Sequence, residues 1–308
     1  MTNSIMQPTL TSTDATLGAI VTDIDLANLT EPQWKIIEDS FHEYVALVFP
    51  NQNLTEEEQI SFAKRFGDIE ILRPNQSIEA VKISNQNDDG TFSDSEDIGY
   101  KNQRGNETWH TDSSYMPIAA KASILSAQVI PAEGGETELA DMSAAYEELN
   151  KAMRDQISDL RAYHSLYQSQ AKAGYTIKTG AHYGYHNMGA PLRPLIKIHP
   201  VTGRKSLFIG RHAYQIAGME CEKSQKLLDE LLCFACQPPR IYTHKWHPGD
   251  VIMWDNRCVL HRARPYQHKE VRTLRHTRVA GDPKTELAKT YPDNLANDFK
   301  PSSSNRPE

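Results

Sequence analysis

The sequence lacks any apolar run that approaches the roughly 20 residues of a membrane-spanning helix. Its N-terminus has neither the basic nor the hydrophobic stretch of a secretory leader. Lysine and arginine form no long run, and the formal net charge is −7, which argues against a general nucleic-acid binder. We therefore expect a cytoplasmic protein that has no nucleic-acid partner and no membrane partner.

Cysteine is scarce, because 308 residues contain only four, all in the C-terminal third. Four clustered cysteines are too few for a disulfide framework, so reduced thiols are expected. Cys233 and Cys236 form one C-x-x-C pair, but no second pair follows and the surrounding residues 222–235 have the pattern of an amphipathic helix. The sequence therefore gives little support for a zinc site.

The sequence also lacks internal repeats and regular alternation of strands with helices. Its apolar fraction of 39% is enough for a sizeable core. Helical patterns are predicted at 31–43, from Thr55 to about 67, at 142–158 and at 222–235. Short strands are predicted at 16–26, 44–49, 80–84, 123–130, 137–141, 195–198, 207–209, 240–244, 250–254, 257–261 and 271–279. Many short strands favour a mostly β barrel or jelly roll with flanking helices over a doubly wound sheet.

We predict a single catalytic domain over residues 1–283, followed by a frayed tail at 284–308. Two segments of this domain, 73–108 and 167–190, are rich in polar residues and glycine. Long polar loops next to a site are candidate lids, although 73–108 is equally compatible with a disordered insertion. Segment 73–108 ends just before His110 and Asp112, two candidate metal ligands, and this position favours a lid.

His110 and Asp112 are the first candidate site residues, because a strand-like context would place both side chains on one face. An imidazole and a carboxylate with one further histidine make a facial triad that suits Fe(II). An isolated His-x-Asp is a weak signal, and a rival pair, His268 and Glu270, lies in what reads as a solvated turn. His261, between two predicted strands, is the third ligand candidate.

The last predicted strand carries Arg272, His276 and Arg278 on one face, with Arg275 on the other. Such a polar face is costly to bury, so it either faces solvent or binds an anion.

Four motifs in this order resemble a known family: His110-Thr-Asp112, the turn Gly134-Gly135-Glu-Thr137, Trp254-Asp-Asn-Arg-Cys-Val-Leu-His261, and Arg272. They resemble the taurine dioxygenase and dichlorophenoxyacetate dioxygenase family of Fe(II), 2-oxoglutarate-dependent oxygenases. Three further stretches look closest to the branch that cleaves (S)-phenoxypropionate herbicides; they begin at Trp109, Gly210 and Ala235.

The resemblance implies a double-stranded β-helix core and iron held by His110, Asp112 and His261. It also implies 2-oxoglutarate held by Arg272 and Thr137, with Asn106 near the co-substrate. O2 would be consumed, succinate and CO2 released, and the substrate hydroxylated. A homodimer or homotetramer is expected on the same ground.

For the substrate, the resemblance favours a small organic anion, in the first place an aryloxyalkanoate-like acid. The taurine enzyme has a second arginine where this sequence has His276, so taurine is disfavoured, while sulfonates, sulfate esters and amino-acid derivatives stay open. We expect Arg278 and His276 to bind the substrate's charge, unless they hold the co-substrate, through its C1 carboxylate in the case of Arg278, or Arg278 pairs with Asp282 or water. A cupin-like metal isomerase or hydrolase is the alternative of another class, but it would not need Arg272 and Thr137 at this spacing.

Overall fold

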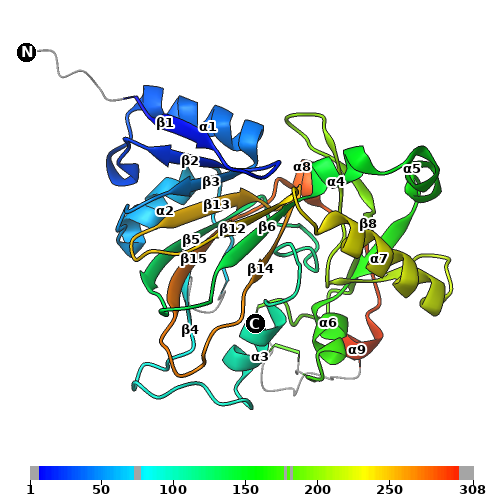
Figure 1. Cartoon of the computed structure of the whole chain (residues 1–308). Coiled ribbons are helices and arrows are strands. Elements are labelled where there is room, and N and C mark those ends of the chain that lie inside the picture. The colour runs from blue at the N-terminus through cyan, green and yellow to red at the C-terminus, as the bar shows by residue number, and fades with distance from the viewer. Residues whose placement is uncertain (1–6, 73–77, 177–178, 181–182, 298–308) are drawn as a thin grey trace, which may run out of the picture.

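A seven-stranded sheet forms the base of the fold (Figure 1). The computed structural model describes residues 7–72, 78–176, 179–180 and 183–297. All neighbours in this sheet are antiparallel except β2 and β3. Its strands in spatial order are β1 (Thr9–Ser12), β2 (Ala19–Thr22), β3 (Ala46–Phe49), β13 (Val251–Asp255), β5 (Ala122–Val129), β15 (Thr273–Val279) and β4 (Ala80–Ser84).

Three smaller sheets complete the strand arrangement. The three-stranded sheet consists of β12 (Ile241–His244), β6 (Thr137–Asp141) and β14 (Val259–Ala263). The four-stranded sheet consists of β11 (Ala213–Ile216), β7 (Arg161–His164), β8 (Ala190–Pro194) and β16 (Thr290–Tyr291). A two-stranded sheet pairs β10 (Lys205–Leu207) with β9 (Ile196–Ile198).

Helices lie outside the sheets, and no described helix is long and apolar enough to cross a membrane. They are η1 (Leu26–Asn28), α1 (Glu31–Tyr44), α2 (Glu56–Lys64), α3 (Ile98–Gly105), α4 (Met142–Glu148), α5 (Lys151–Ile157), α6 (Leu166–Lys172), α7 (Cys221–Ala235), α8 (Pro283–Glu286) and α9 (Asn294–Asn297).

The two faces of the large sheet bury different partners, because side chains alternate along each strand. On β13, Val251 and Met253 join a core formed with α1 and α2. Ile252 and Trp254 point the other way, into a core shared with Leu139 of β6 and Val259 of β14. The three-stranded sheet therefore covers one face of the large sheet and the first two helices cover the other, as Figure 1 shows.

Most long periodic segments have the predicted structure. The mostly β fold with flanking helices is confirmed. The capping box predicted at Thr55 is present, since its Oγ accepts a hydrogen bond from the Glu58 N–H (3.2 Å) and its N–H donates to the Glu58 carboxylate (2.8 Å). The helical pattern at 142–158 is divided into two helices, because Asn150 caps a new helix through the Met153 N–H (2.8 Å).

The polar segments contain more structure than the sequence predicts. Helix α3 lies in 73–108, and most of α6 lies in 167–190. The tail is not frayed over its described part, where α8, β16 and α9 form and Glu286 is 1% exposed. Residues 73–77, 177–178, 181–182 and 298–308 of these predictions lie outside the described residues.

Candidate active site

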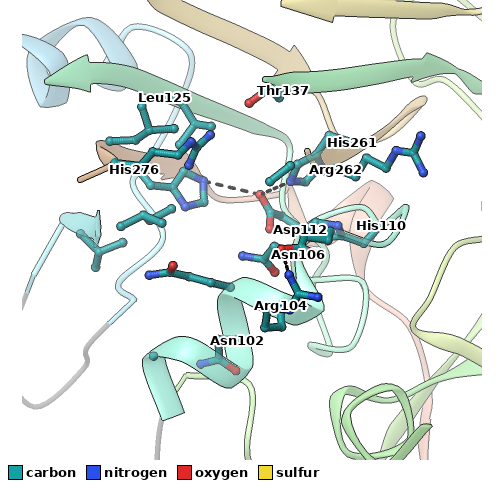
Figure 2. A pocket seen from close by; sticks show the side chains of 18 of the residues that line it. Asn102, Arg104, Asn106, His110, Asp112, Leu125, Thr137, His261, Arg262 and His276 are labelled. Carbon is teal, nitrogen blue, oxygen red and sulfur yellow. Dashed lines mark hydrogen bonds and ion pairs between the residues drawn. The ribbon is translucent and has the colours of Figure 1, made fainter. Parts of the chain in front are cut away.

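A cavity of about 370 Å³ opens between the large sheet and the three-stranded sheet (Figure 2). The strands β4, β5, β6, β14 and β15 contribute to its wall, and helix α3 closes one side. Every predicted site residue lines it: Asn106, His110, Asp112, Thr137, His261, Arg272, His276 and Arg278. The rival His268 also lines the cavity, but it binds the Ser93 carbonyl (2.8 Å) and does not belong to a metal-ligating cluster of described residues.

His110, Asp112 and His261 form a buried cluster whose candidate ligand atoms all lie within 4.8 Å of one another. The backbones of His110 and His261 exchange two hydrogen bonds, of 3.0 and 2.8 Å, which place the ring centroids 4.0 Å apart. Asp112 follows in a turn rather than in a strand, and Ser113 after it has a left-handed backbone (φ 55°). The predicted residues therefore meet, but through this turn and not through the alternation of a strand.

The two histidines of this cluster are held neutral. Burial lowers the pKa of His110 to about 4, and its Nδ1 lies 2.8 Å from the Thr108 carbonyl oxygen. That carbonyl can only accept, so Nδ1 carries the proton and Nε2 keeps a free lone pair. Burial also holds the pKa of His261 well below its usual range, as does the neighbouring His110. Neutral imidazoles are the form that binds a metal.

Asp112 stays ionised although it is buried. Burial works to raise the pKa of its carboxyl, but the charge of the Arg278 guanidinium holds that pKa well below the usual range. Ser123 Oγ donates to Oδ2 (2.5 Å) and Arg278 donates to Oδ1 (3.0 Å). Figure 2 shows Oδ2 between the rings of His261 and His276, at 3.8 and 3.5 Å from their Nε2 atoms.

The predicted parity of the last strand is correct, but the expected role of Arg278 rests on a wrong premise. Its guanidinium is not free for a substrate anion, because it binds Asp112, the Ser113 hydroxyl (2.8 Å) and the Glu70 carboxylate (3.4 Å). Neither Asp282 nor solvent is its partner, since its side chain is 8% exposed and pairs with these groups. His276 Nε2 lies 3.5 Å from Asp112 Oδ2 and has no hydrogen-bond partner among the described residues, so its predicted contact with the substrate stays a prediction.

Arg272 differs from Arg278, because it has no acidic partner among the described residues. It is 5% exposed, and its Nε donates to the Gly135 carbonyl (3.0 Å), but no described carboxylate lies within ion-pair distance. Burial lowers the pKa of this guanidinium to about 10. Gly135 has φ +72°, and a Cβ there would lie 2.9 Å from Arg272 Nε, so the predicted glycine turn makes room for the arginine.

Thr137 begins β6 in the same cavity. Its Oγ accepts the indole N–H of Trp246 (3.0 Å), so the hydroxyl proton remains available to a ligand. Asn106 ends α3 and its backbone carbonyl accepts the Ala263 N–H (2.9 Å), which leaves its side chain at the cavity wall.

Arg211 also lines the cavity, and no role was predicted for it from the sequence. It follows Gly210 in one of the stretches that carry the resemblance, which was the only signal. Its guanidinium donates to Gln170 (2.9 Å) and has no described carboxylate within ion-pair distance. Burial lowers its pKa to about 10. The chain approaches it so closely that a Cβ on Gly105 would lie 2.2 Å from its Nη1.

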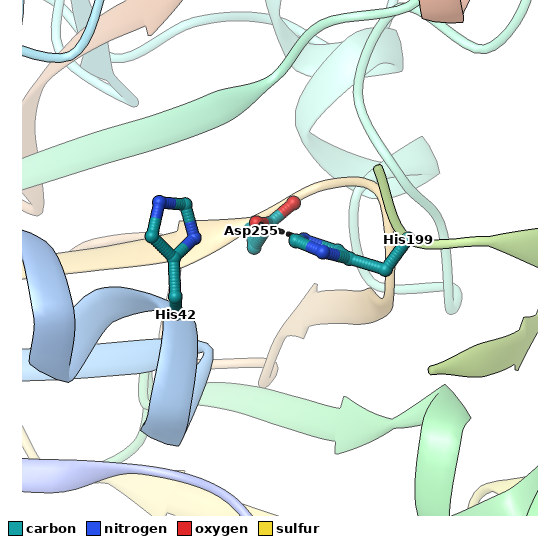
Figure 3. Close-up of side chains that lie close together, drawn as sticks. All are labelled: His42, His199 and Asp255. Atoms are coloured by element: carbon teal, nitrogen blue, oxygen red, sulfur yellow. Dashed lines mark hydrogen bonds and ion pairs between the residues drawn. The ribbon is translucent and has the colours of Figure 1, made fainter. Parts of the chain in front are cut away.

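A second cluster, His42, His199 and Asp255, has the residue types of a metal site, but the ring nitrogens of His199 and the Asp255 carboxylate are engaged within the protein (Figure 3). His199 Nδ1 accepts the N–H groups of Val201 (3.3 Å) and Thr202 (3.1 Å), so the ring proton is on Nε2 and is donated to Asp255 (3.0 Å). Arg257 also neutralises Asp255. Asp255 and Arg257 form a buried ion pair to which His199 donates, and His42 lies beside it with no hydrogen-bond partner for Nδ1 among the described residues.

Comparison with known proteins gives one consistent answer. The family model for "Taurine catabolism dioxygenase TauD, TfdA family" matches residues 9–279. An (S)-phenoxypropionate/alpha-ketoglutarate-dioxygenase of Sphingobium herbicidovorans is 48% identical over 89% of this chain and 96% of its own length. An alpha-ketoglutarate-dependent 2,4-dichlorophenoxyacetate dioxygenase of Cupriavidus pinatubonensis is 38% identical over 86% and 95%. The crystal structure of AAD-2 in complex with Mn(II) and N-oxalylglycine matches with a TM-score of 0.82 and 35% identity, over 93% of this chain and 100% of that one.

Proposed function

The chain belongs to the TauD, TfdA family of Fe(II)- and 2-oxoglutarate-dependent dioxygenases, and on that premise we propose that it hydroxylates a small organic anion, with an aryloxyalkanoate-like acid favoured. The observation that carries the proposal is the charge of the cavity. Seven cationic side chains line it, and only Arg272 and Arg211 have no described carboxylate within ion-pair distance. Arg272 is buried and Arg211 is half-buried, and two such cations without an acidic partner call for two anions.

His110, Asp112 and His261 fit the metal of this family. Two neutral imidazoles and one ionised carboxylate are the donor set of a non-heme Fe(II) site, and the His110 tautomer leaves Nε2 free. When bound there, Fe(II) supplies the positions at which 2-oxoglutarate and O2 react, with release of succinate and CO2. The apolar wall formed by Leu125, Trp254 and Leu274 keeps water from the reacting groups.

Arg272 is the proposed partner of the distal carboxylate of 2-oxoglutarate. Its two terminal nitrogens can form a charge-assisted fork, and the Thr137 hydroxyl can donate a further hydrogen bond. Asn106 is proposed to contact the co-substrate from the end of α3. A dianion of this kind also offsets the cost of burying Arg272.

Arg211 is the proposed partner of the substrate carboxylate. It lies near the metal-ligand cluster, since its charge contributes to lowering the pKa of His110. Gln170 fixes the guanidinium and is itself hydrogen-bonded to Asn102 (2.8 Å) and Tyr185 (3.1 Å). Arg278, by contrast, is already neutralised by Asp112 and Glu70.

The proposed architecture is a double-stranded β-helix in one catalytic domain. The position of the cavity between the large and the three-stranded sheet supports it. We also propose that segments 73–108 and 167–190 cover the cavity, because Asn102 of the first segment is hydrogen-bonded to Gln170 and Tyr185 of the second.

The substrate class is tested by a screen of aryloxyalkanoates, sulfonates, sulfate esters and amino acids, scored by succinate formation coupled to loss of the test compound. We expect coupled turnover with aryloxyalkanoates. Arg211→Leu should raise KM for the anionic substrate at least tenfold. The reason is that a hydrogen bond to a charged group contributes about 1.5–3 kcal/mol, and this variant loses it. KM for 2-oxoglutarate should stay the same. The matched control is Arg264→Leu, a half-exposed cavity arginine. Equal losses in both variants would contradict the role of Arg211.

A further inference from the structure

The two oxygens of the Asp112 carboxylate have different surroundings. Oδ2 is directed toward His261, at 3.8 Å from its Nε2. Oδ1 accepts a hydrogen bond from Arg278 Nη2 (3.0 Å), which is a charge-assisted contact inside the protein. The oxygen on the side of the histidines is therefore free to face a metal with one lone pair beside its bond to Ser123, while the other oxygen is engaged by a cation.

Arg278 is itself held from a second side. Its other terminal nitrogen, Nη1, donates to Ser113 Oγ (2.8 Å) and lies 3.4 Å from Glu70 Oε2. The Ser113 hydroxyl donates to Glu70 (2.8 Å), and the Tyr183 hydroxyl also binds Glu70. Because Glu70 and Tyr183 fix one end of the planar guanidinium, its other end stays on Oδ1. A lysine, with a single charged nitrogen on a flexible chain, could not span both contacts in this way.

We propose that the hydrogen bond from Arg278 keeps Oδ1 of Asp112 away from the metal, so that this aspartate binds the metal through Oδ2 alone. The proposal rests on the proposed function, in which His110, Asp112 and His261 are the ligands. A facial triad occupies three of six positions around the metal. A carboxylate that bound through both oxygens would occupy a fourth, and a chelating 2-oxoglutarate would then leave no position for O2. Arg278 is thus a positioning residue that keeps one coordination position open.

The test counts the water molecules on Mn(II) bound to the protein, from the broadening of its electron paramagnetic resonance by ¹⁷O-labelled water. Wild-type protein should hold water at all three open positions, and Arg278→Leu should hold one fewer. Its Mn(II) affinity should be no weaker than that of the wild type, since a ligand atom is gained and a nearby positive charge is lost. Arg275→Leu is the matched control, because Arg275 lies on the same strand and binds Leu54 and Glu56 on the opposite face.

Each other outcome has a definite meaning. One water fewer in the wild type would overturn the proposal without any variant. Unchanged water numbers with weaker Mn(II) binding in Arg278→Leu would overturn it too, because Arg278 would then only support the site. An Asp112→Ala protein that binds Mn(II) as tightly as the wild type would instead overturn the ligand assignment beneath it.

Discussion

A buried arginine needs a negative partner, which is either a carboxylate of the protein or a bound anion. This criterion separates three arginines of the cavity, of which Arg272 and Arg278 are buried and Arg211 is half-buried. Arg278 is engaged by Asp112 and Glu70, whereas Arg272 and Arg211 have no described acidic partner. Residue identity and strand parity are the same for Arg272 and Arg278, so their roles differ only through their neighbours.

The first prediction concerns the proposed metal ligands. Asp112→Ala and His261→Ala should each abolish coupled turnover and weaken Fe(II) binding by at least tenfold, because a preformed site loses one of three ligands. Circular dichroism should report an intact fold. Full activity in either variant would exclude the triad.

The co-substrate arginine gives the second prediction. Arg272→Ala should raise the 2-oxoglutarate requirement strongly, since a buried carboxylate loses a charged partner that contributes about 2–5 kcal/mol. The measurement is KM for 2-oxoglutarate at saturating substrate. Arg275→Ala, on the outer face of β15, should leave this KM unchanged. An unchanged requirement in Arg272→Ala would show that another group holds the co-substrate.

Much of the site could be predicted at the level of single residues, because the motifs themselves contain the side chains that meet in the cavity. The partners of those side chains could not. Glu70 lies far from Arg278 in the sequence, yet its backbone N–H donates to the Arg278 carbonyl (2.8 Å) and its carboxylate lies 3.4 Å from Arg278 Nη1. The need for a partner was correctly inferred for Arg278, but nothing in the sequence identified Asp112 as that partner.

Among the secondary-structure elements, helix α3 packs closely against the Arg211 guanidinium at Gly105. Gly105→Ala should displace the Arg211 guanidinium, since the new Cβ would lie 2.2 Å from Nη1. We expect KM for the anionic substrate to rise several-fold while KM for 2-oxoglutarate stays the same. Gly99→Ala in the same helix is the control, because a Cβ there meets nothing within 4 Å. If both substitutions behave alike, α3 does not position Arg211.

Whether a helix could be predicted from the sequence depended on the kind of contact that stabilises it. Helix α7 has Leu227, Leu228 and Leu231 buried along one face, a periodicity that is visible in the sequence. Helix α3 has only Gly105 buried and is held by polar contacts such as Asn102 with Gln170 and Gln103 with the Ser84 carbonyl (2.5 Å). Such contacts join segments distant in sequence, so a polar segment of this kind resembles a loop until its partners are known.

At the scale of the whole molecule, the layered fold buries several histidines in their neutral form. Burial lowers the pKa of His110 to about 4 and holds the pKa values of His164, His212 and His261 well below their usual range. His164 is 0% exposed, and neither of its ring nitrogens has a hydrogen-bond partner among the described residues. It lies beside Phe208 and does not line the cavity.

The last prediction concerns the stability of the metal-free protein against pH. Between the ordinary histidine pKa of about 6.5 and the lowered folded values, the unfolded chain binds more protons than the folded one, so the free energy of unfolding must fall as pH falls. His164→Leu removes one of these groups and an unpaired polar ring. Urea unfolding at pH 7 and pH 5 should show that this variant loses about 2 kcal/mol less than the wild type over that interval. An equal loss for His164→Leu and the wild type would mean that His164 is protonated in the folded protein.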